Sequence, residues 1–542
     1  MRVLACVSFV ASVAAQGLPP QPVPPQNPIT QEKAILGKLL FWEEQMSSNN
    51  RTACGTCHTF AAGGGDLRRA PHPGNDGVVP SPDDSFGSPG LVRSDAANDY
   101  LPDPLFGLQV QVTKRASPGF LTAAWFPEMF WDGRAGGQFV DPDTGAVVIP
   151  AGGALENQAI APLLGSNEMA HDARTFAQAT AKLAIVRPMA LATNLPPDMA
   201  AAIANGTTYA DLFEDAFGTP AITAQRIAFA IATYERTLVP NQTPWDLFQA
   251  GNPTALTPAQ VNGMNVFNGP GRCNLCHTPG LFSDGQFRNL GLRPIAQDNG
   301  RQGFTGLFAD RGKFKVPSLR NAGLRTSFMH NGQFTTIAQV FGFYLAGGGP
   351  NLDNKDPLLQ PLGGPPPGGV PPQAAADLQN FVINGLTDPR VAAGTFPFDR
   401  PTLRSQIVPP IGFQYGAASA GTGGLVPTML AQVPANIGNP DFKIGIGSAR
   451  GGAAAVLLLG LQTSAVPIAG TTVLVDPGGA VFVPGTLAGA PGVAGAGYGT
   501  MRVPVPDLPV LLGLTMYTQW FVWDAGVPGG AATTRGAELR FF

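Results

Sequence analysis

The chain is poor in charged residues, and the charges it has nearly cancel. Only 13% of its 542 residues are charged, and 33 Lys and Arg against 36 Asp and Glu give a net charge of −3. A nucleic-acid partner normally requires a basic face, so we expect none. Hydrophobic residues make up 44% of the chain, which is enough to fill packed cores and excludes wholesale disorder.

Long apolar runs are also missing from the sequence. A membrane span needs roughly 18 uninterrupted apolar residues. The run at residues 453–459 is less than half as long and is ended by Gly460. We therefore expect a protein that does not cross a membrane.

The first segment, MRVLACVSFVASVAAQG, has one basic residue, a short apolar run and small residues before Gln16. This order is typical of a secretory signal that is removed from the mature protein. The sequence therefore predicts a signal peptide at residues 1–15. It also predicts an exported protein, either periplasmic or at the cell surface or outside the cell.

Cysteine and histidine are both scarce, with five of each. One cysteine lies in the predicted signal, and four cysteines in an exported protein would normally suggest two disulfides. Their spacing indicates otherwise, because each pair is Cys-x-x-Cys followed directly by His, the attachment pattern of c-type haem. A redox-active dithiol or half of a zinc site would explain neither histidine. The sequence predicts two covalent haems with proximal histidine ligands, at Cys54, Cys57 and His58 and at Cys273, Cys276 and His277.

Two similar segments precede the two haem motifs. Residues 37–41 and 263–267 share the pattern Gly-x-x-[Leu/Val]-Phe within stretches of helical periodicity. They predict two related, mainly α-helical cytochrome-c-like domains. The predicted boundaries are a Pro-rich lead-in at residues 16–29, an N-terminal haem domain at 30–245, a C-terminal haem domain at 246–400 and a further domain at 401–542.

The last predicted domain has a different composition. It contains no His or Cys, and short β-prone runs such as residues 441–446, 471–475 and 518–523 alternate with Gly and Pro turns. This pattern predicts an all-β sandwich that supplies no haem ligands and serves as an accessory or surface-interaction module.

Four further stretches carry a resemblance to a known family. They are, in chain order, Met129-Phe-Trp131-Asp-Gly-Arg134-Ala, Leu155-Glu-Asn-Gln158-Ala-Ile-Ala-Pro162 with Glu168-Met169 after it, Tyr234-Glu-Arg-Thr-Leu238, and Phe314-Lys-Val-Pro317-Ser-Leu-Arg320-Asn with Met329-His330-Asn-Gly332 after it. With these motifs, residues 28–395 resemble the bacterial dihaem cytochrome c peroxidases and their MauG-like relatives. The region after residue 400 does not take part in the resemblance.

The resemblance implies that peroxide binds at the N-terminal haem, with His58 as the proximal ligand. Gln158, Pro162 and Glu168 match the residues over the open distal face in the family. Splitting peroxide requires an acid/base group near the iron, so Glu168 is the expected acid and Gln158 its hydrogen-bonding partner. Trp131 matches a tryptophan that lies between the haems and relays electrons.

The second haem, bound through His277, is expected to be the electron-transfer centre. Its distal ligand is Met in the peroxidases and Tyr in the MauG-like proteins, and the matching position here is Tyr344. Met329 is the rival candidate. His72 lies where the peroxidases place a removable distal histidine of the first haem, and it is a candidate ligand of the resting state. The roles of His171 and His330 stay open.

Three departures from the family pattern bear on function. An insertion before Gln158 predicts a β-hairpin around residues 141–150. In the family, two sequence elements contribute ligands to a calcium ion between the domains. Both elements are altered here, at residues 115–118 and 325–327, so calcium binding is in doubt, although backbone carbonyls could still contribute. The tryptophan through which MauG-type proteins oxidise their protein substrate is replaced by Gly271.

These observations together predict a dihaem peroxidase that reduces hydrogen peroxide to water. Electrons would come from a small redox protein such as a cytochrome c or a cupredoxin. One alternative is a MauG-like oxidase that uses peroxide to modify a protein or organic substrate, as Tyr344 suggests. Another is a non-enzymatic electron carrier with both irons six-coordinate. The oligomeric state, with a homodimer as one option, is open.

Overall fold

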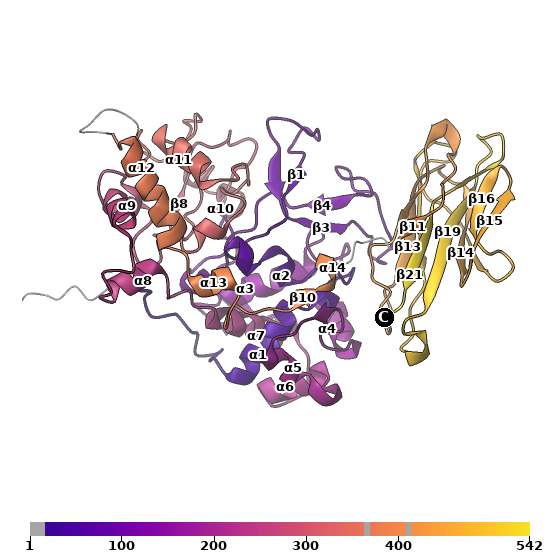
Figure 1. The fold of residues 1–542 in the computed structure, drawn as a ribbon, viewed down its shortest axis with the longest axis horizontal. Coiled ribbons are helices and arrows are strands. Elements are labelled where there is room, and N and C mark those ends of the chain that lie inside the picture. The colour runs from indigo at the N-terminus through magenta and orange to yellow at the C-terminus, as the bar shows by residue number, and fades with distance from the viewer. Residues whose placement is uncertain (1–16, 363–368, 408–412) are drawn as a thin grey trace, which may run out of the picture.

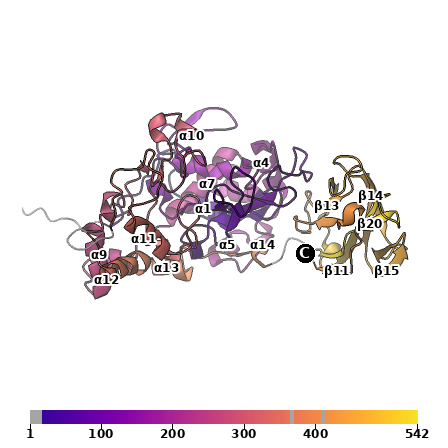
Figure 2. The same cartoon turned by 90° about the horizontal axis from the view of Figure 1, so that it is seen from above.

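The computed structural model describes residues 17–362, 369–407 and 413–542. The predicted signal at residues 1–15 lies outside these ranges. Figure 1 shows a helical part and a sheet-rich part next to each other along the longest axis, and Figure 2 shows the same division from above. Within the described ranges, no helix combines the length and the apolar character that a membrane crossing needs.

Two crossed helices form the centre of the first core. α1 (Gln31–Phe41) begins after Thr30, whose side chain accepts a hydrogen bond from the N–H of Lys33, and α7 (Ala224–Thr237) packs against it. The helices touch at Gly37, where a Cβ atom would overlap the carbonyl oxygen of Ala230. Only a glycine permits this approach of two backbones. Leu39, Leu40 and Phe41 of α1 are fully buried around the crossing.

The second core repeats this crossing. α9 (Pro258–Asn268) packs against α12 (Pro372–Asn380), and a Cβ atom at Gly263 would overlap the carbonyl oxygen of Asp377. Gly37 and Gly263 are the first residues of the two matching segments found in the sequence. The repeated pattern therefore has a common structural reason, which is close contact between the helix before each haem motif and a later helix.

Further helices complete the helical part, and one segment connects its two cores. α13 (Pro389–Ala393) and the residues after it return to the first core, where Val391, Phe398 and Leu403 are buried. The other helices of this part are α2 (Cys54–Cys57), α3 (Ala154–Ile160), α4 (Phe176–Ile185), α5 (Pro197–Ala202), α6 (Tyr209–Phe217), α8 (Pro244–Gln249), α10 (Gln302–Thr305), α11 (Ile337–Leu345) and α14 (Arg404–Ile407).

Short strand pairs lie among the helices and loops of the helical part. β1 (Ala70–His72) pairs with β2 (Ser85–Gly87), and β3 (Pro89–Val92) pairs with β4 (Val110–Val112). β8 (Phe287–Arg288) pairs with β9 (Phe314–Lys315), and β10 (Thr402–Leu403) pairs with β7 (Ala192–Thr193). The hairpin predicted around residues 141–150 is present as β5 (Phe139–Val140) and β6 (Val147–Ile149).

The C-terminal part, residues 413–542, is called the sheet-rich module below. Its six-stranded sheet has the order β11-β21-β19-β14-β17, with β20 paired to β19, and a second sheet has the order β12-β13-β18. Both sheets contribute to one hydrophobic core, and the β15–β16 pair covers the other face of the larger sheet. The expectation of a sheet-rich C-terminal region is confirmed, and the predicted run 471–475 coincides with β16.

The strands of the module are β11 (Gln414–Tyr415), β12 (Thr428–Leu430), β13 (Lys443–Ala449), β14 (Ala454–Gly460), β15 (Thr463–Ile468), β16 (Thr471–Val475), β17 (Val481–Thr486), β18 (Gly497–Arg502), β19 (Thr515–Trp523), β20 (Ala531–Thr533) and β21 (Gly536–Arg540).

Candidate dihaem site

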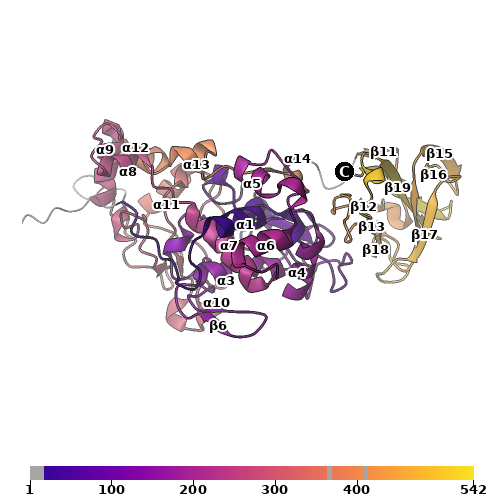
Figure 3. The same ribbon diagram turned by 90° about the horizontal axis from the view of Figure 1, so that it is seen from below.

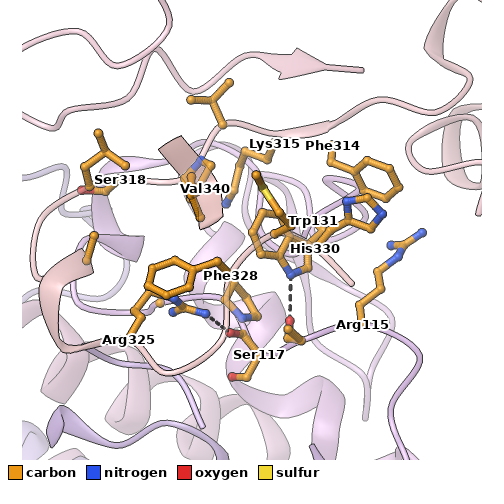
Figure 4. Close-up of a pocket in the computed structure, with 18 of the residues that line it drawn as sticks. Arg115, Ser117, Trp131, Phe314, Lys315, Ser318, Arg325, Phe328, His330 and Val340 are labelled. Carbon is orange, nitrogen blue, oxygen red and sulfur yellow. Dashed lines mark hydrogen bonds between the residues drawn. The ribbon is translucent and has the colours of Figure 1, made fainter. Parts of the chain in front are cut away.

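One cavity of about 750 Å³ runs through the helical part and reaches both Cys-x-x-Cys-His motifs. All six motif residues line it, namely Cys54, Cys57, His58, Cys273, Cys276 and His277. The four cysteines are free thiols, so the disulfide alternative does not describe them. Figure 4 shows part of the cavity, with side chains from segments distant in the sequence facing one another.

The first motif is held by its own loop. It forms α2, where the hydroxyl of Thr56 accepts a hydrogen bond from the N–H of Ala53 and the N–H of His58 donates to the carbonyl of Cys54. The Nδ1 atom of His58 lies 3.0 Å from the carbonyl oxygen of Gly64. A carbonyl can only accept, so this contact assigns the proton to Nδ1 and leaves the Nε2 lone pair for a metal. Burial lowers the pKa of His58, which keeps the ring neutral.

The second motif repeats this arrangement. The N–H of His277 donates to the carbonyl of Cys273, and its Nδ1 lies 2.9 Å from the carbonyl oxygen of Phe282. The Nε2 lone pair of His277 is therefore also free for a metal. Two neutral imidazoles, each adjacent to a pair of thiols on the wall of one cavity, fit the attachment of two c-type haems.

Three residues expected on the distal side of the first haem line the same cavity. They are Gln158 on α3, Pro162 in the turn that follows, and Glu168 in the next loop. The N–H of Glu168 donates to the carbonyl of Gly165, which closes this loop. Burial raises the pKa of Glu168, and the nearby Arg134 opposes this effect. The carboxyl group therefore keeps its proton to a higher pH than an exposed glutamate does.

Trp131 and His330 occupy the middle of the cavity wall (Figure 4). Trp131 is buried, and its Nε1 donates to the carbonyl of Ala116 at 2.8 Å. The ring of His330 stacks on Phe314 with a centroid distance of 3.5 Å and meets Trp131 edge-on at 6.4 Å. Burial lowers the pKa of His330 to about 3, so its ring is neutral. Its Nε2 atom is buried without a hydrogen-bond partner among the described residues.

Two partly buried cations in this region, Arg325 and Lys315, face the cavity and have no carboxylate partner among the described residues. The Nη2 atom of Arg325 donates to the carbonyl of Ser117 at 2.8 Å, and the Nζ atom of Lys315 donates to the carbonyl of Glu128 at 3.0 Å. Neither forms an ion pair within the part of the chain that the structure describes. Buried cations normally pair with anions, and a haem carries carboxylates that suit this donor set.

The altered calcium elements lie in the same region. The carbonyl oxygens of Ala116 and Ser117 accept hydrogen bonds from Trp131 and Arg325. The described residues contain no group of three or more His, Cys, Asp or Glu side chains placed to hold a metal ion. Calcium binding, which the altered elements leave open, is not supported by these contacts.

The structure brings Tyr344 and Met329, the two candidate distal ligands of the second haem, to the cavity wall. Tyr344 lies on α11, and its ring meets that of Phe343 edge-on at 5.4 Å. Both candidate ligands line the cavity, and the ligation of the second haem by Tyr344 stays a prediction.

Two histidines do not line the cavity. His72 lies on β1, where its Nδ1 accepts a hydrogen bond from the N–H of Gly74 at 3.2 Å and its ring contacts Phe106. The Nδ1 of His171 lies 2.8 Å from the carbonyl oxygen of Asp172. In this structure the candidate ligand His72 is not brought together with the other site residues, and ligation by it stays a prediction.

One acidic residue of the cavity was not expected. Glu235 of α7 lines it, is buried, and has no hydrogen-bond partner for Oε2 among the described residues. Burial raises its pKa to about 8, although Arg236 opposes the effect. The only sequence signal was its place within the motif Tyr234-Glu-Arg-Thr-Leu238, which does not reveal which face of the helix turns to the cavity.

Known proteins show similarity to this chain. Residues 31–254 match a family model described as di-haem cytochrome c peroxidase. The methylamine utilization protein MauG of Methylophilus methylotrophus is 28% identical over 325 residues, which cover 60% of this chain and 75% of that protein. The cytochrome-c peroxidase IdrP1 of Pseudomonas sp. (strain SCT) is 29% identical over 378 residues, which cover 64% of this chain and 80% of that protein.

A solved structure is also similar in fold. It is the crystal structure of a MauG-like protein associated with microbial copper homeostasis, with a TM-score of 0.50 and 23% identity. The match covers 72% of this chain and 98% of that chain. The family match and the relatives confirm the resemblance predicted from the motifs, and with it the expectation of a haem-dependent oxidoreductase at the level of the family.

Proposed function

We propose that this relative of the dihaem cytochrome c peroxidases and MauG proteins reduces hydrogen peroxide to water at its N-terminal haem site. Each turnover joins one peroxide with two protons and two electrons and yields two water molecules. The electrons enter through the C-terminal haem site from a small redox protein such as a cytochrome c or a cupredoxin. The observation that carries this proposal is one cavity lined by both haem motifs and by Gln158, Pro162 and Glu168.

Glu168 is the proposed acid. Its raised pKa favours the protonated carboxyl group, which donates a proton to the oxygen that leaves as water. The amide of Gln158 can both donate and accept hydrogen bonds, and it holds the peroxide beside that carboxyl group. When bound, the haems supply the iron chemistry of peroxide reduction and electron transfer.

Trp131 is the proposed relay between the two halves of the cavity. It is buried on the wall of the cavity that reaches both motifs, and its hydrogen bond to Ala116 fixes the plane of the indole ring. A fixed, oxidisable ring in this place supports electron exchange between the predicted haem domains at residues 30–245 and 246–400. We also keep the prediction that the protein is exported.

The test is the variant Glu168→Gln, which keeps the size of the side chain and removes the acid. We expect the rate of peroxide-dependent oxidation of reduced cytochrome c to fall by about 100-fold to 10,000-fold, the usual contribution of a positioned acid/base group. Glu214→Gln, at an exposed position of α6, is the matched control and should be unchanged. Full turnover by Glu168→Gln would contradict the assignment.

A second candidate function is a MauG-like oxidase that uses peroxide to modify a protein or organic substrate. The observation that favours it is the place of Tyr344 on the cavity wall beside the second motif. Steady-state assays separate the two functions, because rapid oxidation of reduced cytochrome c by peroxide supports the peroxidase and its absence supports the oxidase. A high-spin signal in the resting or half-reduced protein would exclude an electron carrier with two six-coordinate irons.

A further inference from the structure

The sheet-rich module presents an unusual outer face to the helical part. The isoleucines of β13 pack into the core between the sheets, so the alternate residues of this strand point outward. Two of these are Gly445 and Gly447. A Cβ atom at Gly445 would overlap the ring of Tyr100, and one at Gly447 would lie 2.6 Å from Leu108. The glycines leave space that side chains of the helical part fill.

The segment that fills this space is called the docking hairpin here and comprises residues 89–112, including β3 and β4. The N–H of Tyr100 donates to the hydroxyl of Thr500 at 2.8 Å, and its own hydroxyl accepts from the N–H of Gln432. The Nζ atom of Lys443 donates to the hydroxyl of Ser94 at 3.0 Å. Figure 3 shows β12, β13 and β18 on the side of the module that faces the helical part. The docking hairpin therefore binds the sheet-rich module both by packing into the space at the two glycines and by hydrogen bonds.

The same hairpin contacts the loop of residues 165–172, called the Glu168 loop here. The side-chain amide of Gln111 donates to the carbonyl of Ser166 at 2.9 Å. Arg93 forms an ion pair with Asp172 at 2.9 Å, and the N–H of Asp172 donates to the carbonyl of Ser94. Ser94 thus links the two sides, since its hydroxyl binds the module and its carbonyl binds the loop.

The closest approach lies beside the proposed acid. A Cβ atom at Gly90 of β3 would overlap the carbonyl oxygen of Asn167 and would lie 3.3 Å from the Cα atom of Glu168. Backbone packs directly on backbone at this point, so a displacement of the hairpin displaces the loop. A shift of about 1 Å in a positioned group is enough to reduce a reaction rate strongly.

We propose that the sheet-rich module is a positioning element of the peroxide site, which holds the Glu168 loop through the docking hairpin. This inference rests on the proposed function, because it concerns the proposed acid Glu168. It assigns a role to the region of the chain that lies outside the family resemblance. Tyr100, Gly445 and Ser94 are its positioning residues.

The test is the full-length, haem-loaded variant Gly445→Val, which adds a side chain against the ring of Tyr100 without changing any residue of the helical part. We expect the rate of reaction with peroxide to fall about ten-fold, less than on removal of the acid itself. Amide hydrogen exchange in residues 89–112 and 165–172 should become faster. Ala454→Val, at an exposed position of β14 in the same module, is the matched control and should leave both measurements unchanged.

The pH profile separates positioning from general destabilisation. The protonated form of Glu168 is the active one, so the rate should fall as pH rises through its pKa. If the Glu168 loop is loosened, the carboxyl group of Glu168 becomes more exposed to solvent, and its raised pKa is lowered. The alkaline limb of the profile should therefore move to lower pH in Gly445→Val, whereas mere loss of folded protein would scale the rate and leave the limb in place.

Tyr100→Ala provides a second route, because it removes the ring instead of adding bulk. If hydrogen exchange shows a loosened hairpin in either variant while the rate and the pH profile match the wild-type protein, the inference is wrong. It is also wrong if neither variant changes the exchange of residues 165–172, since the module then does not hold that loop. Failure of the proposed function would show differently, as a wild-type protein that does not react with peroxide, while the exchange measurement still reports on the docking.

Discussion

The two regions that contain the Cys-x-x-Cys-His motifs have the same framework and differ in the side chains placed on it. In both, a helix that precedes the haem motif crosses a later helix at a glycine, and the Nδ1 atom of the motif histidine contacts a carbonyl of its own loop. The crossings also correspond in detail. The Cβ atom of Tyr234 would lie 2.8 Å from a Cβ at Gly37, and that of Phe381 would lie 2.8 Å from one at Gly263.

This correspondence shows where the regions diverge. If Tyr234 corresponds to Phe381, then the next residues, Glu235 and Val382, are equivalent, and both line the cavity. The first region therefore has a buried acid where the second has an apolar side chain. Glu168 adds another carboxyl group near the cysteines of the first motif. Tyr344 lies near the cysteines of the second motif. A repeated framework thus carries different side chains at equivalent positions of the two regions.

The largest expected effect comes from breaking one crossing at a time. Gly37→Val places a side chain on the carbonyl oxygen of Ala230, and Gly263→Val does the same at Asp377. Because backbone cannot yield as a flexible side chain does, each should lower the free energy of unfolding by more than about 3 kcal/mol. Chemical denaturation followed separately at each haem would show which core is lost.

The control for this prediction is Gly342→Ala on α11, where a Cβ atom meets nothing within 4 Å. It should be neutral or stabilise the protein by about 0.5–1 kcal/mol, since alanine is a better helix former than glycine. If Gly37→Val and Gly263→Val were both as stable as this control, the crossings would not explain the repeated glycine pattern.

An effect of intermediate size on the pH dependence of stability is expected at Glu235. Its pKa is about 8 in the folded protein, above that of an unfolded glutamate, so the folded state binds more protons between pH 5 and 8. Stability should therefore fall as pH rises through this window. Half of this difference between the folded and unfolded pKa of Glu235 still corresponds to a change of roughly 2 kcal/mol in the free energy of unfolding.

Glu235→Gln removes the charge and should flatten this part of the pH dependence of the free energy of unfolding, measured by denaturant titration at pH 5 and pH 8. Glu214→Gln, exposed on α6, should leave the slope as it is. An unchanged slope in Glu235→Gln would mean that the carboxylate is stabilised by a partner in the loaded protein.

The smallest expected effect concerns the helix caps at the two crossings. Thr30 caps α1 alone, whereas Thr257 caps α9 within a reciprocal pair, since its N–H donates to Gln260 and its hydroxyl accepts from the N–H of Gln260. Thr30→Ala and Thr257→Ala should each cost about 1 kcal/mol. Gln260→Ala should cost less than Thr257→Ala, and thermal unfolding of the three variants would check this order. If Gln260→Ala lost more stability than Thr257→Ala, the bond accepted by the Gln260 side chain would matter more than the bond accepted by the Thr257 hydroxyl, contrary to the prediction.

Much of this arrangement could be predicted because its signals are local. The spacing of Cys54, Cys57 and His58, repeated from Cys273, predicts the haem attachment chemistry without any folded structure. The strands of the C-terminal region follow from short alternating runs between turns, and the boundaries of β16 agree with the predicted run. The glycines at 37 and 263 were visible as a pattern, although their reason was not.

The remaining features depend on contacts between distant segments. No local pattern could reveal that Gly445 makes room for Tyr100, which lies 345 positions earlier, because either residue alone is unremarkable in a strand or a loop. The same holds for His72, whose motif position suggested a ligand while packing placed its ring against Phe106.

The sequence by itself determined the two Cys-x-x-Cys-His motifs, the resemblance to the dihaem peroxidases and MauG proteins, and the division into a helical and a sheet-rich part. These features follow from the spacing and periodicity of residues, which are properties of the covalent chain and do not depend on how it folds. Only the tertiary structure decided that both motifs face one cavity and that the sheet-rich module contacts the hairpin beside Glu168. It also decided that Glu235 is a buried acid whose Oε2 has no hydrogen-bond partner among the described residues. Burial and proximity depend on how distant segments pack, and these properties set pKa values and position reacting groups.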